Sequence, residues 1–599
     1  MEYLIWDVII MKLFRLIIKS LKSSSFMIIL YVIFSLLVAY LTTFMPVIIQ
    51  YFLDVLLKQQ VNNKIIVFFI NLFDGKLSFI PIMCILLIIV EGIIIFSTYL
   101  RTIIKNKIIQ EFQYEIKFKL FNHIQNLTYH DFYKSSLADL VQNSTDDVNN
   151  IVGFIEKQLT FILDLLLIII FAIGQLSNLN LYLSIVMINA IAIIIACSIY
   201  YFKKSRAIID DDLKSQRNLY EKLNDNYSNI KFMKINNLED KELQNFNIVN
   251  NNNYEINRKK VVIDSLYKIF TGGVVKTQTP VILLISSILF SKKLITVGSI
   301  YITINYSNKI TSSFIDLSEI LETFNLCIAS CKRLNQLLSF DLETDDNKDK
   351  NIVINDTTIS FNNVNIKVNG TTILKNLNFM INPNEKVMII GSTGSGKSIL
   401  FKTLIGFYEY EGSIKIGQYE IRDLNKKYIR ENICLLLQDS YLFSRTIAEN
   451  IRILIPSISN LEMINLSTFF SFHDDVEKLN DGYNSQIGKN GIILSKGQRQ
   501  RLILIRAYTK PKPIMIFDDS FSAIDRINKK NILDKLLSLD DNSSKIFITH
   551  DIQLAPKFDK IIYLNNGNAI SGTHEELLKN EQYRSIYELD LNKVGEEYV

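Results

Sequence analysis

The chain has 599 residues, of which 49% are hydrophobic and 21% are charged, against a charged share of about 25% in ordinary soluble domains. Lys and Arg number 65 and Asp and Glu number 60, a net charge of +5, which excludes both the strongly basic field of a nucleic-acid-binding protein and an acidic solvating tail. Five Cys in so long a chain exclude a disulfide-based fold, and the apolar content excludes intrinsic disorder.

Residues 1–24 predict an amphipathic N-terminal helix. Basic residues recur there at helical spacing, with apolar residues off that stripe: Lys12, Arg15, Lys19 and Lys22. We expect this helix to lie on the inner leaflet of a membrane, although a solvated helix that leads into the membrane explains the same pattern.

Six hydrophobic runs of membrane-spanning length occupy the first half of the chain, and the second half has none. They lie near Phe26–Leu57, Leu77–Ile104, Leu159–Leu176, Leu181–Phe202, Ile269–Phe290 and Ile295–Leu321. Lys276, Gln278 and Lys309 interrupt the last two runs. The pattern predicts an α-helical transmembrane bundle of six spans within a domain at residues 25–338.

Basic residues predict the orientation of this bundle. They concentrate in the connections between runs two and three and between runs four and five, so these connections should be cytoplasmic. The loop around Lys58, Lys64 and Lys76 and the pair Lys292 and Lys293 are exceptions on the predicted outer side. Few Pro or Gly residues interrupt Lys105–Val152 and Lys203–Lys260, which predicts that both connections are helical extensions of the spans.

Charged residues inside the spans are costly and therefore indicate function. Glu91, Asp164 and Lys276 are the candidates. They would contact a transported molecule, or Glu91 and Lys276 would form an internal ion pair.

The character of the chain changes after Leu338. Residues 339–352 form a charged linker, and residues 353–599 alternate Val- and Ile-rich runs with helical stretches. This alternation predicts an α/β domain.

A glycine-rich loop follows the apolar run Lys386–Ile390 and precedes a helical stretch. It consists of Gly391, Ser392, Thr393, Gly394, Ser395, Gly396, Lys397 and Ser398. Glycines let backbone N–H groups face phosphate oxygens, Lys397 reaches the β- and γ-phosphates, and the Ser398 hydroxyl can bind Mg²⁺. The sequence therefore predicts a binding site for a nucleoside triphosphate.

A second apolar run, Ile514–Phe517, ends in Asp518 and Asp519. A carboxylate at the end of a buried strand beside a phosphate loop is the expected place for a Mg²⁺ ligand. We assign that role to Asp518.

Four further motifs follow the phosphate loop in order along the chain. Residues 437–439, with 443–444 and 447–451, resemble the Q-loop region of ABC exporters, 494–501 resemble the signature motif, 522–525 the D-loop and 548–550 the switch histidine. The six hydrophobic runs resemble the membrane half of an exporter half-transporter. The segments 138–140 and 146–148 are similar to the first cytoplasmic loop of that family.

The resemblance implies that two such domains pack head to tail, with each ATP between the phosphate loop of one and the signature motif of the other. Asp519 would then be the catalytic base, and Gln438 would sense Mg²⁺ and the attacking water. His550 would contact the γ-phosphate, the alternative being a buried structural histidine. The other residues that the resemblance implies in nucleotide binding are Ser495, Gly497, Gln498 and Asp525.

The chain also departs from the family pattern. Asp519 stands where Glu is usual, and because a misplacement of ~1 Å can cost ~10²-fold in rate, hydrolysis at this chain's phosphate loop should be slow unless a relaxed backbone or a water restores the contact. Lys496 replaces a signature glycine and adds a cation beside the phosphates. Val368 stands where exporters stack an aromatic ring on adenine, with Phe361 the nearest aromatic residue, so nucleotide affinity loses on the order of 1 kcal/mol of stacking unless it is compensated.

The resemblance implies an ATPase that uses ATP and Mg²⁺ to export an amphipathic drug, lipid or peptide by alternating access. It implies a bacterial cytoplasmic membrane, nucleotide-binding domains in the cytosol and no nucleic-acid partner. A homodimer would have no site with the usual base, so a heterodimer is favoured. The alternative is a hydrolysis-poor, membrane-anchored ATP-sensing or regulatory subunit.

Overall fold

The computed structural model describes residues 25–57, 79–134, 140, 143–315, 317–343, 356–368, 370–392, 394–438, 441–488 and 493–596. The predicted N-terminal helix, Thr393 and most of the charged linker lie outside these ranges. The chain divides into two compact units. One comprises Met1–Leu127 and Ser135–Asp341, and the other comprises Thr128–Lys134 and Leu342–Val599.

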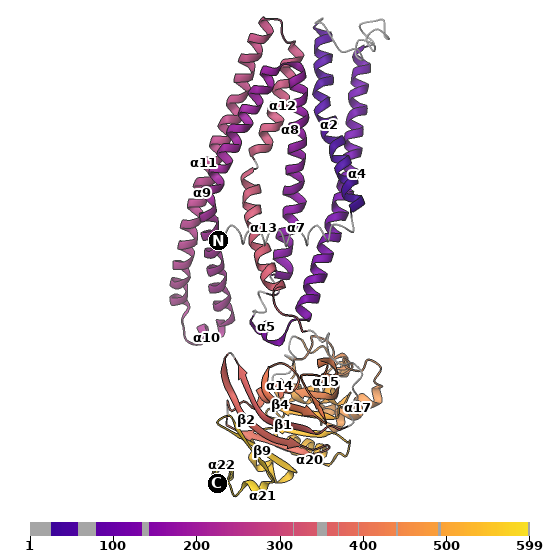
Figure 1. Cartoon of the computed structure of the whole chain (residues 1–599), viewed down its shortest axis with the longest axis vertical. Helices are drawn as coiled ribbons and strands as arrows, with labels where there is room; N and C mark the ends of the chain where they lie inside the picture. Colours follow the sequence, from indigo (N-terminus) through magenta and orange to yellow (C-terminus); the bar gives the residue numbers. More distant parts are fainter. Residues whose placement is uncertain are drawn as a thin grey trace. The chain divides into compact units, whose positions relative to one another are not determined.

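The first unit is built of helices (Figure 1). Its long elements are α2 (Ser25–Leu56), α4 (Phe79–Gln125), α8 (Thr160–Leu179), α9 (Leu181–Ser228), α11 (Glu239–Ser291), α12 (Val297–Ile315) and α13 (Leu317–Leu338). Shorter segments are η2 (Asn143–Asp147), α7 (Val148–Gly153), η3 (Phe154–Leu159) and α10 (Ile230–Ile235). Helices are the expected spanning element because they satisfy their backbone hydrogen bonds internally.

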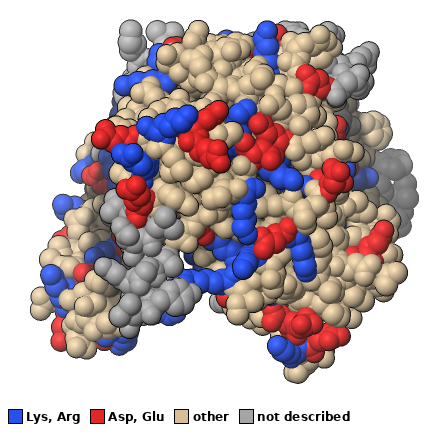
Figure 2. All heavy atoms as spheres, turned by 90° about the horizontal axis from the view of Figure 1, so that it is seen from below, with Lys and Arg blue, Asp and Glu red and all other residues tan. Residues whose placement is uncertain are grey.

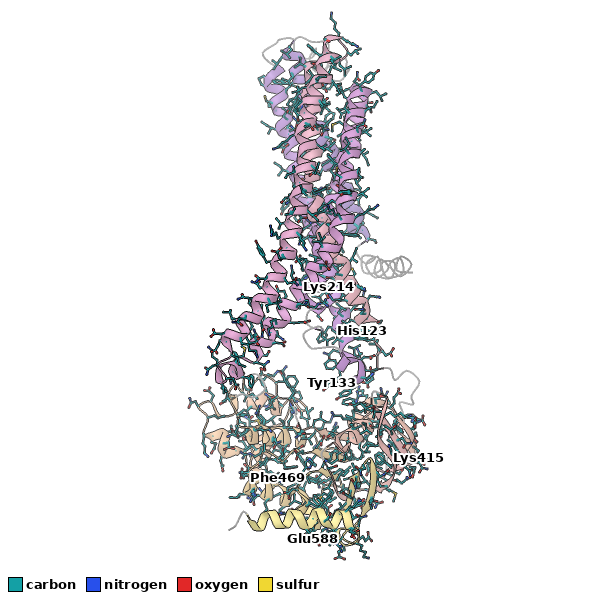
Figure 3. The ribbon with its side chains drawn as sticks, turned by 90° about the vertical axis from the view of Figure 1, so that its left-hand side faces the viewer. His123, Tyr133, Lys214, Lys415, Phe469 and Glu588 are labelled. Atoms are coloured by element: carbon teal, nitrogen blue, oxygen red, sulfur yellow. The ribbon has the colours of Figure 1, made fainter. Side chains whose placement is uncertain are left out.

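Five stretches of the described helices are long and apolar enough to cross a membrane: Ser25–Leu56, Met83–Gln125, Ser144–Leu179, Leu181–Ser205 and Glu239–Ser291. Between 17% and 39% of their apolar windows is buried inside the protein. Large apolar side chains such as Ile88, Phe96 and Ile170 are therefore exposed, and Figure 3 shows side chains projecting along the length of these helices. A surface of this kind suits lipid, because continuous apolar faces are not stable in water.

The sixth predicted run forms α12, which is less apolar than the other five stretches. Its polar residues Ser299 and Thr303 are buried against the bundle. At its start, the backbone N–H of Gly298 donates to the Asp54 carboxylate of α2 at 2.9 Å. The polar character of this run thus reflects packing between helices, which tolerates hydroxyl groups that hydrogen-bond within the bundle.

The predicted helical extensions are confirmed in part: the described residues of both connections are mostly helical, but α4 ends at Gln125 and Thr128–Lys134 belongs to the second unit. Helix α4 continues without a break to Gln125, and α9 continues to Ser228. Helices α9 and α11 lie side by side (Figures 1 and 3). Hydrogen bonds join them, including Ser198 with Tyr267 at 2.8 Å and the ion pair of Lys260 with Asp212 at 3.1 Å.

One of the three charged span residues forms an ion pair with a neighbouring helix. Asp164 of α8 accepts two hydrogen bonds from Arg101 of α4, at 2.9 and 3.0 Å. The hypothesis of a Glu91–Lys276 pair is wrong: both side chains are exposed and no ion pair joins these two described residues. The opposite charges of these two residues had suggested the pair, but each side chain is exposed in this structure.

The second unit contains two β-sheets. A four-stranded antiparallel sheet has the order β2 (Thr371–Ile381), β1 (Ile359–Val368), β4 (Tyr410–Ile416) and β5 (Tyr419–Glu420). A six-stranded sheet has the order β10 (Asn568–Gly572), β9 (Lys560–Asn565), β3 (Lys386–Gly391), β8 (Ser544–Ile548), β7 (Ile514–Asp518) and β6 (Ile433–Leu436), parallel except for β10.

Helices accompany these strands in the α/β arrangement predicted from the sequence. They are α14 (Lys397–Leu404), α15 (Lys426–Asn432), α16 (Ile447–Ile451), α17 (Asn460–Phe469), α18 (His473–Glu477), α19 (Lys496–Tyr508), α20 (Arg526–Ser538), α21 (His574–Leu577) and α22 (Glu581–Glu596), with the 3₁₀ segments η4 (Gly482–Asn484) and η6 (Ile552–Lys557). On the face shown in Figure 2, basic and acidic side chains are interspersed, as on a solvated surface.

Both faces of the parallel sheet are buried. Residues on one face, such as Met388, Met515 and Phe547, belong to one hydrophobic core, whereas the alternating residues Ile389 and Ile516 belong to another. A parallel sheet with two covered faces reads as continuous apolar runs in the sequence. Its strand ends meet at one edge, where chemistry-bearing residues are placed together.

Candidate functional site

The glycine-rich loop joins β3 to α14, which confirms the strand–loop–helix context. Gly396, directly before the helix, has a φ of 93°, a left-handed conformation that glycine adopts without steric cost. A Cβ at this position would also lie 2.9 Å from the Leu374 side chain. Gly391, Ser392, Gly394 and Ser395 complete the described part of the loop.

Lys397 is folded back over this loop and is nearly buried. Its Nζ donates to the carbonyl oxygens of Gly391 at 2.7 Å and Ser392 at 3.0 Å. Burial lowers the pKa of Lys397, while the nearby carboxylates of Asp518 and Asp519 oppose that shift. The ammonium group is therefore held at the mouth of the loop, where phosphate oxygens can replace the carbonyl partners.

Asp518 ends the buried strand β7 and lies beside the start of α14. It is 5% exposed, and the Ser398 side chain hydrogen-bonds to its carboxylate. Burial raises the pKa of Asp518 above its ordinary value, although Ser398 and nearby lysines oppose the shift. A hydroxyl and a carboxylate in contact are oxygen ligands of the kind that Mg²⁺ prefers, so Ser398 and Asp518 fit the metal role predicted for them.

Asp519 follows at once, with a φ of 46°. Its backbone N–H donates to the carbonyl of Ile548 at 3.0 Å, and its carboxylate accepts from Nε2 of Gln438 at 3.2 Å. The tertiary fold thus brings Gln438, which follows β6, to the candidate base.

His550 follows β8 at the same edge of the sheet. Its side chain is exposed, which excludes the alternative of a buried structural histidine. Within the described ranges its ring has no hydrogen-bond partner. The ring is therefore free to reach an incoming phosphate group.

The signature residues stand at the start of α19. The Ser495 hydroxyl accepts from the Gln498 N–H at 3.2 Å, and Gln498 Oε1 accepts from the Ser495 N–H at 2.9 Å, a reciprocal helix cap. Lys496 is exposed beside them. Among the described residues, no hydrogen bond joins Ser495, Gly497 or Gln498 to the phosphate loop of this chain.

Asp525 has a structural role in this conformation, as the N-cap of α20. Its carboxylate accepts from the backbone N–H of Asn528 at 3.1 Å and from its side chain at 2.9 Å. The Asn528 side-chain bond lowers the pKa of Asp525.

Phe361 is unavailable for adenine stacking. Its ring is 1% exposed and stacks on Phe379 at a centroid distance of 4.4 Å. It belongs to the core because it alternates inward along β1. Val368 lies at the hairpin end of the same strand, opposite Thr371.

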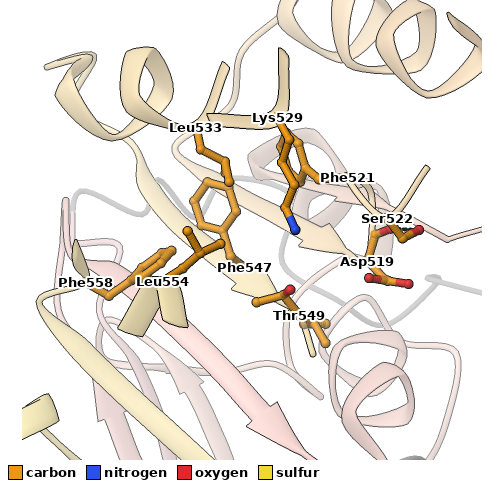
Figure 4. A pocket seen from close by; sticks show the side chains of 10 residues that line it. Asp519, Phe521, Ser522, Lys529, Leu533, Phe547, Thr549, Leu554 and Phe558 are labelled. Atoms are coloured by element: carbon orange, nitrogen blue, oxygen red, sulfur yellow. Dashed lines mark hydrogen bonds between the residues drawn. The ribbon is translucent and has the colours of Figure 1, made fainter. Parts of the chain in front are cut away.

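A cavity of about 20 Å³ adjoins Asp519 (Figure 4). It is lined by Asp519, Phe521, Ser522, Lys529, Leu533, Phe547, Ile548, Thr549, Leu554 and Phe558. A water molecule needs roughly 10–15 Å³ and two or more polar partners. The cavity thus has room for a water beside the candidate base and is far too small for a nucleotide.

Sequence reasoning missed an aromatic contact within the second unit. Tyr129 of α5 (Tyr129–Lys134) stacks on Phe407 with a centroid distance of 4.1 Å and an interplanar angle of 7°. Arg430 lies over the Phe407 ring at 5.3 Å and binds both carboxylate oxygens of Glu343, at 2.7 and 2.6 Å. No local pattern could have revealed the contact, because its partners lie far apart in the sequence.

Replacing Asp518 with Asn should stabilise the nucleotide-free chain at pH 7, because it removes a buried charge. The folded-state pKa of Asp518 is raised, so the folded chain binds the proton of this carboxyl more tightly than the unfolded chain does. The buried charge therefore lowers the free energy of unfolding increasingly as pH rises through that pKa. The gain in melting temperature, a few degrees at pH 7, should vanish below the ordinary value of 3.8. Thermal melts across this pH range measure it; a lower melting temperature for Asp518→Asn at pH 7 would contradict the explanation.

Comparison with known proteins agrees with this geometry. Residues 28–314 match the family described as ABC transporter transmembrane region, and residues 374–522 match the ABC transporter family. The chain belongs to the ABC exporters. Its two family regions in one polypeptide make it a fused half-transporter, and its nucleotide-binding domain is an ATPase whose hydrolysis is coupled to transport.

Relatives of this ABC exporter share its layout over most of their length. The uncharacterized ABC transporter ATP-binding protein YfiB of Bacillus subtilis (strain 168) is 28% identical over 82% of this chain and 86% of its own. The multidrug resistance-like ATP-binding protein MdlA of Buchnera aphidicola subsp. Schizaphis graminum is 26% identical over 93% and 94%. A bacterial Atm1-family ABC exporter with ATP bound superposes with a TM-score of 0.79 at 20% identity, covering 95% of this chain and 98% of the other.

Proposed function

We propose that two half-transporters, this chain and a partner, form a pump that exports an amphipathic drug, lipid or peptide by alternating access. The observation that carries the proposal is the convergence of Lys397, Asp518, Asp519 and Gln438 at one edge of the parallel sheet. These groups combine an anion site, a metal site and a candidate base. The words export and multidrug in the names of several relatives support the direction and the class of cargo.

The residue roles follow from the site. Lys397 and the backbone of the phosphate loop bind the phosphates, while Ser398, Asp518 and Gln438 would hold Mg²⁺, which would neutralise charge on the transferred phosphoryl group. Asp519 orients the attacking water, and His550 contacts the γ-phosphate. Ser495, Gly497 and Gln498 act on the ATP held by the partner, which accounts for their lack of bonds to this chain's own loop.

The partner is a different chain in this proposal. Asp519 is shorter than the usual glutamate by one methylene, so a homodimer would contain two slow sites. In a heterodimer, the partner supplies a glutamate at its own phosphate loop, and this chain supplies Ser495 opposite it. One site then turns over at a normal rate.

Transmission to the membrane half is assigned to α5. This helix comes from the connection between the second and third spans, yet Tyr129 stacks on Phe407, close to the end of α14. Stacked rings transmit small displacements because close-packed groups resist compression. The basic residues of that connection support a cytosolic location for the nucleotide-binding domain, and the bacterial relatives support the inner membrane of a bacterium.

The experiment is uptake into inside-out vesicles from cells that express the chain with or without its genomic neighbour. We expect ATP-dependent accumulation of an amphipathic dye or peptide, and none with the Lys397→Ala chain. Accumulation only when the neighbour is present supports the heterodimer, whereas rapid Mg-ATPase of the purified chain alone, abolished by Asp519→Asn, would overturn it. ATP binding without accumulation under either condition would instead favour the regulatory subunit.

A further inference from the structure

Gln500, on the second turn of α19, connects this helix to the loop after the candidate base. Its side chain is 7% exposed. Its Nε2 donates to the Ser522 hydroxyl at 3.3 Å, and its Oε1 accepts from the Ala523 N–H at 2.9 Å. Both polar atoms of the Gln500 amide therefore hydrogen-bond to the same loop, residues 522–525, which resembles the D-loop.

That loop is tied back to Asp519. The Ser522 hydroxyl donates to the Asp519 carbonyl at 3.0 Å, and the Ser522 N–H donates to the same oxygen at 3.3 Å. A continuous set of hydrogen bonds thus runs from the backbone of the base through Ser522 to Gln500. These hydrogen bonds are all direct, and no water is needed to complete the set.

The start of α19 is pressed against the same loop. A Cβ on Gly497 would lie 2.7 Å from the Ala523 carbonyl oxygen, so only glycine permits this approach. Gly497 is in the first turn of α19, which Ser495 and Gln498 cap. The signature glycine and the D-loop are therefore packed backbone to backbone, and the Gln500 side chain hydrogen-bonds to the same loop.

We propose that Gln500 is a positioning residue that fixes the signature end of α19 relative to the carboxylate of Asp519. This inference rests on the proposed function, in which Ser495 serves the ATP held by the partner and Asp519 serves the ATP on this chain's own loop. Gln500 then holds half of each ATP site in one rigid piece. A displacement at one site reaches the other through this amide, which is a coupling between two distinct sites.

The test uses the full chain, in the assembly that hydrolyses ATP, in lipid nanodiscs. Gln500→Leu keeps the volume but removes both hydrogen bonds. We expect kcat for Mg-ATP to fall roughly 10- to 100-fold, since displacements of about 1 Å have effects of that size. KM, and the Kd of a fluorescent ATP analogue at the phosphate loop, should stay within about twofold of the wild type.

Gln500→Glu keeps the acceptor for the Ala523 N–H and should recover part of kcat. Ser522→Ala should lower kcat as well, and in combination with Gln500→Leu it should add little, because both changes break the same connection. Ser459→Ala removes the cap of α17, remote from the site. It controls for stability: it should lower the melting temperature and leave kcat unchanged.

The outcomes separate the two levels of the argument. If the wild-type assembly shows no ATP hydrolysis that the Lys397→Ala substitution abolishes, the proposed function and this inference are both overturned. Normal wild-type turnover with an unchanged Gln500→Leu variant would overturn the inference alone. If KM or the nucleotide Kd of the Gln500→Leu variant rises by the same factor as kcat falls, Gln500 has only a structural role. The same conclusion holds if a drop in melting temperature accounts for the whole fall in kcat.

Discussion

Lys397→Ala should lower kcat for Mg-ATP hydrolysis by on the order of 10²- to 10³-fold, the size of effect seen when one preorganised donor is removed from a developing charge. The structure explains the size. Nζ of Lys397 is nearly buried and is held at 2.7 Å from the Gly391 carbonyl, so no water replaces it easily. A fluorescent ATP analogue should also bind more weakly, and both are measured on the purified assembly.

Lys415→Ala is the matched control. Lys415 is on β4 of the antiparallel sheet (Figure 3), where it pairs with Ser360 of β1 and Glu420 of β5, and its removal should leave turnover unchanged. Equal turnover of the Lys397→Ala and Lys415→Ala chains would contradict the assignment of the phosphate loop.

Asp519→Glu should raise turnover at the site built on this chain's own phosphate loop, by about 10- to 100-fold, because the added methylene moves the carboxylate toward the attacking water by about 1 Å. The site must be isolated to see this. Single-turnover hydrolysis, with a partner whose own phosphate-loop lysine is replaced, measures it. An unchanged rate would show that Asp519 already contacts the attacking water, either directly or through a second water held in the cavity beside it.

The same substitution should cost stability. Asp519 has a φ of 46°, and left-handed backbone costs roughly 1–2 kcal/mol for most residues, with Asp and Asn the tolerated exceptions. Asp519→Glu should therefore melt at a lower temperature than the wild type. Asp519→Asn should keep the melting temperature and lose turnover, which separates the backbone effect from the chemical one.

The sequence predicted the local elements of the site well because they depend on short-range chemistry. The glycine loop between an apolar strand and a helix, and the carboxylates Asp518 and Asp519 after a second strand, form as the pattern indicated. Parallel strands bring their ends to one edge, so the meeting of Lys397, Ser398 and Asp518 followed from strand direction alone.

Predictions that needed the positions of separate helices succeeded less well. Glu91 and Lys276 carry opposite charges and lie in different spans, but both are exposed and do not pair, while Asp164 pairs with Arg101. Likewise Phe361 was the nearest aromatic residue to an adenine site in sequence, yet its strand alternation places it in the core.

Composition, hydropathy and motif order by themselves determined that this protein joins a helical membrane half to an α/β nucleotide-binding domain, because span length and phosphate-loop chemistry act over short stretches of chain. Only the tertiary structure decided which side chains share an environment. Gln500 touches Ser522, and Tyr129 touches Phe407, through packing between elements remote in sequence. Such contacts depend on how whole helices and sheets bury their apolar faces, which no local pattern encodes.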